Sequence, residues 1–393
     1  MDSERLRIAI VVGTLGQAGA EKQLVYLVRS LCAQRNPPVE VRVYSLTHGE
    51  HYESALVELG CPPVWFGQLN SPVLRLVELI RLARVYRPHV IHSSHYYTNI
   101  YAGLAGTALG VLSAGSSRAD PRMEVADNGR WGRWLFRVTD GMIANSHNAR
   151  DVLVAMGLAP ERVHVLPNVI DLAAFDRAAG PRVESPPGGL CAILVGRLIR
   201  PKRVEVFLQA LAQARRVNPE IRGLIAGDGP LRGELEARAA ELGLSGDGVR
   251  FLGHRSDVPA LLAGSDVLVS VSELEGFPNV MLEAMAACRA VIATPAGDSA
   301  RIVADGVSGY LLPIDAAPAA EALAGRLIEL AAEPELRAAL GAAGRRRVEA
   351  DYSLHGEAPN SPADRLLAIY RCLAERAGQG RLLHLLEGPV EKA

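Results

Sequence analysis

The sequence predicts an α/β protein with two doubly wound parallel sheets. Short β-branched runs alternate with longer helical patterns along almost all of its 393 residues, which is the order expected when helices connect parallel strands. The length is that of about two domains. Hydrophobic residues make up 49% of the chain and charged residues 22%. This balance is typical of a packed globular protein and excludes a disordered, collagen-like or coiled-coil chain.

The expected elements follow one another regularly. In the first half we expect strands at residues 8–12, 39–45, 64–66, 90–93, 142–145 and 163–167, with helices near 20–34, 51–59, 72–86, 98–110 and 146–156. In the second half we expect strands at 191–196, 221–227, 249–252, 267–270, 291–294 and 310–312, then helices over most of 334–376. Residues 96–117 carry no charge, but their many small residues favour a buried helix and strand over a membrane span.

The Pro- and Gly-rich stretch 180–189 is interpreted as a linker. It would separate an N-terminal domain, 1–179, from a C-terminal domain, 190–355. Residues 356–393 are expected to form a helical segment, for which packing back on the first domain is one arrangement. Ligands of doubly wound folds bind at the carboxyl ends of the strands, so we expect a cleft between the two sheets and a hinge at the linker.

Charge and cysteine content exclude several classes. The net charge of −1 gives no sign of the strong positive bias of a nucleic-acid binder. The five cysteines form no C-x-x-C pair and no metal-ligand spacing, so we expect reduced thiols and a cytoplasmic location. The apolar run near the N-terminus is too short for the core of a signal peptide.

The most informative segment is 272–287, SELEGFPNVMLEAMAA. Pro278 suits the first position of a helix, where its missing N–H is no loss. The free N–H groups that follow, from Asn279 and Val280, would form an anion site. Glu275 would lie in the loop before this helix and Glu283 about one turn into it, so both carboxylates can flank a phosphorylated ligand. Alternatively, Glu283 is a solvated helix residue.

A second segment, 193–208, places Gly196 and Arg197 at the end of a strand and Lys202 at the start of a helix. A guanidinium and an ammonium in the same crevice would bind a diphosphate. The alternative is an ordinary basic surface. However, only three of the 42 basic residues are lysines (Lys22, Lys202 and Lys392). A lysine at this point therefore favours the diphosphate site over an ordinary basic surface.

Two further signals are weaker. Glycine turns follow the strands near 224–235 and 14–21, and Gly16 and Gly19 in the latter can approach a phosphate or form a plain tight turn. The stretch 130–137, RWGRWLFR, interleaves arginines with aromatic residues. Such spacing suits a membrane-surface contact or an acceptor platform, or else an ordinary helix with a charged face.

Together these segments resemble family 4 glycosyltransferases of the GT-B fold over nearly the whole chain. The family's E-x7-E motif matches Glu275 to Glu283, and its G-R-L-x-x-x-K element matches Gly196 to Lys202. Supporting matches lie at 145–171, 226–236, 251–258 and 305–313.

The resemblance implies roles for these residues. Arg197 and Lys202 would bind the donor diphosphate, and Glu275 would contact the donor sugar as the third catalytic residue. Glu283 would hold the ribose, with the base near His254 and Arg255. The resemblance also implies transfer of a sugar, with retention at its anomeric carbon, from a nucleotide-diphosphate donor. The departing phosphate would accept the acceptor's proton.

It further implies no metal and no separate cofactor, and the sequence contains no D-x-D motif. The acceptor would be a glycan, a lipid-linked molecule or a small molecule, which is compatible with peripheral contact at the inner face of a membrane. The sequence names neither the sugar nor the base.

The chain departs from the family pattern at Ala18, Val169 and Arg301. It also lacks, in 115–121, a histidine that many members carry near the acceptor. His95 and Arg118 are the candidates for that side of the site. Two alternatives remain at this stage: a nucleotide-sugar epimerase of similar fold, and a non-catalytic binding subunit that keeps the fold.

Overall fold

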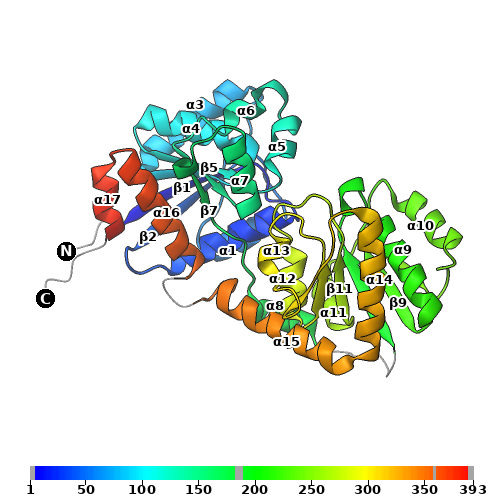
Figure 1. Cartoon of the computed structure of the whole chain (residues 1–393). Helices are drawn as coiled ribbons and strands as arrows, with labels where there is room; N and C mark the ends of the chain where they lie inside the picture. Colours follow the sequence, from blue (N-terminus) through cyan, green and yellow to red (C-terminus); the bar gives the residue numbers. More distant parts are fainter. Residues whose placement is uncertain (1–4, 182–188, 357–359, 388–393) are drawn as a thin grey trace, which may run out of the picture. The chain divides into compact units, whose positions relative to one another are not determined.

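The computed structural model describes residues 5–181, 189–356 and 360–387. Its contacts divide the chain into two units, Met1–Val169 with Leu354–Ala393, and Ile170–Ser353 (Figure 1). The division thus comes at residue 170, ten residues before the expected linker, because Phe175 is buried in the core of the second unit. Most of the linker itself, 182–188, lies outside the described residues.

The first unit is built on a seven-stranded parallel sheet of order β3-β2-β1-β4-β5-β6-β7. Its strands are β1 Leu6–Val12, β2 Val39–Ser45, β3 Val64–Trp65, β4 Val90–Ser93, β5 Leu112–Ser117, β6 Gly141–Ala144 and β7 Val163–Val165. Its α-helices are α1 Gly19–Ala33, α2 Glu53–Glu58, α3 Pro72–Tyr86, α4 Asn99–Leu109, α5 Pro121–Asp127, α6 Gly132–Leu135, α7 His147–Ala155, α16 Pro362–Arg376 and α17 Gly380–Glu387. Short 3₁₀ helices are η1 Tyr96–Thr98, η2 Gly129–Trp131 and η3 Pro160–Arg162.

Helices cover both faces of this sheet (Figure 1). Because alternate residues of a strand point to opposite faces, Ile8 and Ile10 pack in one core with α1, α16 and α17, whereas Ala9 and Val11 pack in another with α3 and α4. The C-terminal helices therefore complete the first unit. Tyr370 of α16 is fully buried there.

The second unit has a six-stranded parallel sheet of order β10-β9-β8-β11-β12-β13. Its strands are β8 Leu190–Val195, β9 Ile221–Ala226, β10 Val249–Gly253, β11 Val267–Ser270, β12 Ala290–Ala293 and β13 Gly309–Leu311. Its helices are α8 Leu172–Ala179, η4 Arg200–Lys202, α9 Val204–Val217, α10 Arg232–Glu241, α11 Val258–Ala263, α12 Asn279–Ala286, α13 Ser299–Ile302, α14 Ala316–Ala332 and α15 Pro334–Asp351.

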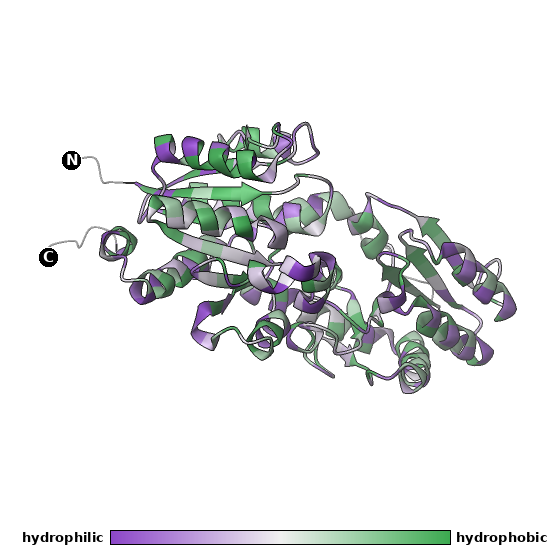
Figure 2. Ribbon diagram, turned by 90° about the horizontal axis from the view of Figure 1, so that it is seen from above, coloured by the Kyte–Doolittle hydropathy of each residue, from purple (hydrophilic) through white to green (hydrophobic). Residues whose placement is uncertain are grey.

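This sheet is also buried on both faces. Leu190, Ala192 and Leu194 pack with α9, α10 and α14, whereas Ile193 packs with α8, α11, α12 and α15. Strands covered on both faces are continuously apolar, and Figure 2 accordingly shows them mostly green between helices with purple outer faces. The predicted α/β class with two doubly wound parallel sheets is confirmed.

The uncharged stretch 96–117 forms the buried helix and strand that its composition favours, α4 and β5. In the described part of the chain, no helix combines the length and the apolar character needed to cross a bilayer. The five cysteines are free thiols.

Candidate functional site

The motif residues of the second unit lie at one edge of its sheet. All six strands are parallel, so their carboxyl ends meet at this edge. Gly196 and Arg197 follow β8, and Glu275 lies in the loop after β11, the neighbour of β8 in the sheet. From β8 the chain first adds β9 and β10 on one side, and then adds β11, β12 and β13 on the other side. The connections therefore diverge between β8 and β11, which is where ligands of such sheets bind.

Two of the predicted residues contact each other at this point. The Lys202 ammonium forms an ion pair with Oε1 of Glu275. The Ser272 hydroxyl donates to the same carboxylate oxygen over 2.7 Å. The side chains of Lys202 and Glu275 are only 24% and 12% exposed, so solvent screens this pair less than a surface pair.

Glycines allow the loops around this pair to touch. A Cβ on Gly227, after β9, would lie 1.8 Å from the carbonyl oxygen of Gly196. A Cβ on Gly297, after β12, would lie 2.6 Å from the carbonyl oxygen of Gly276 and 2.7 Å from that of Glu275. Both glycines have positive φ, +148° and +57°. The loop that holds Glu275 is thus packed directly against the neighbouring loop, backbone to backbone.

Arg197 is exposed, and it forms no ion pair with another residue that the structure describes. The following turn places the Lys202 stem above Gly196, whose added Cβ would be 3.6 Å from Cε of Lys202. Both cations therefore start from the same strand end, as the sequence predicts, while only Lys202 has an acidic partner here.

The helix α12 begins one residue later than expected. Pro278 occupies the position before the helix, and the first helical residues are Asn279 and Val280. Pro278 itself makes no side-chain cap hydrogen bond at this end. Met281, Leu282, Ala284 and Met285 are buried, and Glu283 is half-buried between them. The expectation of a largely buried helix is confirmed.

His254 and Arg255 follow β10, the edge strand, and both are exposed. Arg255 donates from Nε and Nη2 to the two carboxylate oxygens of Asp257, at 2.8 and 2.6 Å. Two strands, β9 and β8, separate this pair from β11. They share the sheet edge with the other motif residues without touching the Lys202–Glu275 pair.

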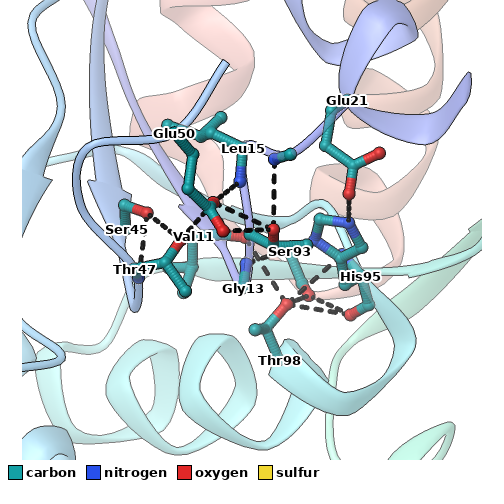
Figure 3. A network of polar contacts seen from close by, with 12 residues as sticks. Val11, Gly13, Leu15, Glu21, Ser45, Thr47, Glu50, Ser93, His95 and Thr98 are labelled. Carbon is teal, nitrogen blue, oxygen red and sulfur yellow. Dashed lines mark hydrogen bonds and ion pairs between the residues drawn. The ribbon is translucent and has the colours of Figure 1, made fainter. Parts of the chain in front are cut away.

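In the first unit, the loop after β1 is fixed by an acidic residue that the sequence analysis missed (Figure 3). The carboxylate of Glu50 accepts hydrogen bonds from the Leu15 backbone N–H and from the hydroxyls of Thr14 and Thr47. Burial raises the pKa of Glu50, but these hydrogen bonds together lower it by more. The pKa of Glu50 is therefore below its ordinary value. Gly16 lies in this loop, donating its N–H to Thr14 Oγ1 over 3.1 Å, and Gly19 begins α1.

His95 is buried at the carboxyl end of β4, with 8% exposure. Its Nδ1 accepts the Gly13 N–H at 3.2 Å, so the neutral ring carries its proton on Nε2. Nε2 lies 3.1 Å from Oε1 of Glu21, which is 4% exposed (Figure 3). Tyr97 stacks on the His95 ring at a centroid distance of 5.4 Å. His95 thus adjoins the glycine loop of residues 13–19, with its tautomer set by the backbone.

Arg118 follows β5, the next strand of the sheet. Its backbone N–H donates to Glu124 over 2.9 Å, and its side-chain Nε is buried without a hydrogen-bond partner among the described residues. Burial lowers the pKa of Arg118 to about 10, and burial raises that of Glu124 to about 7. Arg118 and His95 therefore both lie at the carboxyl edge of this sheet, on adjacent strands.

The stretch 130–137 does not form the single helix that its spacing suggests. It comprises η2 and the one-turn α6, and Phe136 is fully buried because it packs in the core with Met142. Trp131 and Trp134 remain 58% and 41% exposed. The Arg130 guanidinium lies over the Trp131 ring, 4.9 Å from its centroid. Only two of the three aromatic residues can therefore meet a partner.

Among the described residues, no group of three or more His, Cys, Asp or Glu side chains has the arrangement of a metal site.

Two family models match the chain. The one described as Glycosyltransferase Family 4 matches residues 18–174, and the one described as Glycosyl transferases group 1 matches residues 181–347. The alpha-maltose-1-phosphate synthase of Mycolicibacterium smegmatis is 30% identical over 312 residues, which cover 72% of this chain and 78% of that protein. The chain belongs to glycosyltransferase family 4.

Other similarities of this family 4 glycosyltransferase differ in how much of each chain they cover. The Vi polysaccharide biosynthesis protein VipC/TviE of Salmonella typhi is 36% identical over 118 residues, so the match spans only 20% of that relative's length. The crystal structure of Anabaena Alr3699/HepE in complex with UDP and glucose superimposes with a TM-score of 0.73 at 20% identity, covering 95% of this chain and 100% of that one. The fold is GT-B, as the resemblance implies.

Membership of the family establishes the class of reaction. The protein is a retaining glycosyltransferase that uses a nucleotide-sugar donor. This favours transfer over the epimerase and binding-subunit alternatives.

Proposed function

We propose that the second unit binds the donor with its diphosphate between Arg197, Lys202 and the start of α12. The observation that supports this is the Lys202–Glu275 ion pair at the carboxyl ends of the neighbouring strands β8 and β11, where the chain connections run to opposite sides of the sheet. An ammonium has three donors, so Lys202 can hold Glu275 with one of them and a phosphate oxygen with another. Arg197 is exposed just after β8 and can add a bidentate contact.

In this proposal Glu275 contacts the donor sugar. It is held by Ser272 and Lys202, so its orientation is fixed before a sugar hydroxyl reaches it. Glu283, half-buried one turn into α12, holds the ribose. Asn279 and Val280 offer N–H groups at the helix start to the phosphates, and His254 and Arg255 lie near the base.

Negative charge develops on the leaving diphosphate as the glycosidic bond breaks. Arg197, Lys202 and the N-terminus of α12 would stabilise this charge, and preorganised groups of this kind supply a large part of catalysis. The departing phosphate would take the proton of the acceptor hydroxyl on the same face of the sugar. No covalent glycosyl-enzyme step is needed, unlike in retaining glycosidases.

Gly16, Gly19, His95 and Arg118 are proposed for the acceptor side. His95 and Arg118 follow neighbouring strands of the first sheet. The acceptor is proposed to be a glycan, a lipid-linked molecule or a small molecule. Exposed Trp131 and Trp134, with Arg130 and Arg133 beside them, are proposed to make a peripheral contact with a membrane, because an indole suits the interfacial region of a bilayer.

The donor roles are tested by a screen that measures release of nucleoside diphosphate, starting with UDP-glucose and run with and without glycan and lipid acceptors. Glu275→Gln and Glu283→Gln are then compared on the active donor. Contacts that strengthen in the transition state affect kcat, and uniform contacts affect KM. We therefore expect Glu275→Gln mainly to lower kcat, and Glu283→Gln mainly to weaken nucleotide binding.

Thermal melts with and without nucleoside diphosphate separate a binding defect from a folding defect. Normal nucleotide binding by Glu283→Gln, together with its loss in Glu275→Gln, would require the two roles to be exchanged.

A further inference from the structure

A large pocket lies at the opposite edge of the first sheet from His95 and Arg118. It is lined by Arg7 in the second position of β1, by His89 just before β4 and by Val111 just before β5. The amino ends of three neighbouring strands therefore form its floor. The ends of α3 and α4 and the start of α17 form its walls, and Figure 1 shows α17 beside the end of the sheet where β1 begins. Its volume is about 590 Å³.

The pocket is strongly basic. Among the described residues that line it are four arginines and one histidine, and no aspartate or glutamate: Arg7, Arg84, Arg87, His89 and Arg381. These residues come from β1, α3, the turn before β4 and α17. A chain with a net charge of −1 thus gathers five basic side chains around one hollow. Such a concentration of guanidinium groups attracts anions and matches the geometry of phosphate.

Two of these groups are already held in place. The Nε of Arg7 donates to the carbonyl oxygen of Arg87 over 2.7 Å. The Arg7 backbone N–H donates to Nδ1 of His89 over 3.0 Å, so the neutral His89 ring carries its proton on Nε2. Nη2 of Arg7 lies 3.4 Å from that Nε2. Both atoms are then donors, which cannot bond to each other but can share a single acceptor oxygen.

An apolar surface adjoins the basic pocket. A second hollow, of about 760 Å³, shares Arg84 and Arg87 with it and is lined by Val77, Ile80 and Val85 of α3. Val77 and Val85 are 57% and 76% exposed, and Val73 and Leu74 on the same helix are 68% and 53% exposed. A cluster of exposed aliphatic side chains on one helix is typical of a surface that binds another molecule.

We propose that the basic pocket binds a phosphate group, carried either by a lipid headgroup at a membrane surface or by a soluble phosphate ester. The arginines would take the phosphate oxygens, and the aliphatic face of α3 would lie against the apolar part of the ligand. This site is independent of the proposed donor site. It belongs to the first unit and lies at the amino ends of its strands, whereas the donor site lies at the carboxyl ends of the strands of the second unit.

The test uses the full chain and two probes. One is sedimentation with vesicles of phosphatidylcholine containing 30% phosphatidic acid, compared with phosphatidylcholine alone. The other is titration with glycerol 1-phosphate. Arg84→Gln/Arg381→Gln removes two pocket arginines that lie on exposed helix positions. Its matched control, Arg216→Gln/Arg346→Gln, removes two exposed arginines of α9 and α15.

A basic residue close to an anionic surface contributes about fivefold to binding, so the pocket variant should bind a phosphate probe roughly 25-fold more weakly, and the control less than twofold. If the unchanged chain binds the vesicles and the pocket variant does not, the phosphate belongs to a lipid. If the unchanged chain binds only glycerol 1-phosphate and the pocket variant loses this binding, the phosphate belongs to a soluble ester. Binding of neither probe, or equal effects of the two double variants, overturns the proposal. Nucleoside diphosphate binding should stay unchanged in both variants, which shows that a lost signal does not come from misfolding or from the donor site.

Discussion

The contact between the loops after β11 and β12 gives a sharp test of how Glu275 is positioned. Gly297 has φ of +57°, and a Cβ there would lie 2.6 Å from the carbonyl oxygen of Gly276 and 2.7 Å from that of Glu275. Real Cβ atoms essentially never approach closer than 3.0 Å, so Gly297→Ala must move the Glu275 loop by at least about 0.4 Å. A misplacement of about 1 Å costs on the order of 10²-fold in rate. We therefore expect a loss of roughly tenfold in kcat.

The matched control is Gly306→Ala. Gly306 also has a positive φ, +70°, but its added Cβ would meet nothing within 4 Å. An alanine in left-handed backbone costs both variants about 1–2 kcal/mol, and Gly297→Ala should melt at a lower temperature than Gly306→Ala because its loop must also move. Steady-state release of nucleoside diphosphate then isolates the effect of the displaced loop. If the kcat of Gly297→Ala stays within twofold of that of Gly306→Ala, the packing against Gly297 does not position Glu275.

Two other changes have clear expected outcomes. Lys202→Ala should lower kcat/KM by roughly 10²–10³, as loss of one preorganised stabilising group does, and Arg197→Lys should also lower it, because an ammonium cannot reproduce the guanidinium fork. Near-full activity of Lys202→Ala on the identified donor would refute the diphosphate assignment. Burial raises the pKa of Glu124 from 4.5 to about 7, so the folded chain retains a proton that the unfolded chain loses, and stability should decrease by about 3 kcal/mol between those pH values. Glu124→Gln keeps an acceptor for the backbone N–H groups and removes this slope, which denaturant titrations at pH 5 and pH 8 would measure; an unchanged slope would show that another group titrates.

The sequence predicted the strands of both sheets well, because fully covered parallel strands must be continuously apolar. Predicted and observed bounds agree at 39–45, 90–93 and 267–270, and elsewhere differ by a few residues. The helix ends depend on more than the apolar pattern. Pro278 is compatible with a place just before the helix or at its first position, and only the backbone conformation decides between them.

Burial of individual aromatic residues was not predictable from spacing. Arginines and aromatic residues alternate along 130–137, which reads as one amphipathic face. The break between η2 and α6 turns Phe136 into the core and leaves Trp131 outside. The local sequence does not predict that Phe136 is buried, because the residues it packs against, Met142 and Leu153, come from β6 and α7.

Glu50 illustrates a site residue that carried no signal. In the sequence it is one acidic residue in a polar loop, 35 positions from Leu15. In the fold, β2 pairs with β1 along its length, so the loop that follows β2 meets the loop that follows β1, and Glu50 binds the Leu15 N–H there. Cys32 and Cys61 are brought together similarly, with 3.5 Å between their sulfur atoms.

By itself, the sequence determined the α/β class, the parallel sheets, the glycosyltransferase family and the residues proposed for the donor, because hydrophobic periodicity and closely spaced motifs are local properties of the chain. The tertiary structure decided which of those residues touch. It paired Lys202 with Glu275 across 73 positions, completed the first unit with α16 and α17, and gathered Arg7, Arg84 and Arg381 around one pocket. The physical reason is that a parallel sheet aligns strand ends that are far apart along the chain, and the contacts made at those ends are set by strand order, which no local pattern encodes.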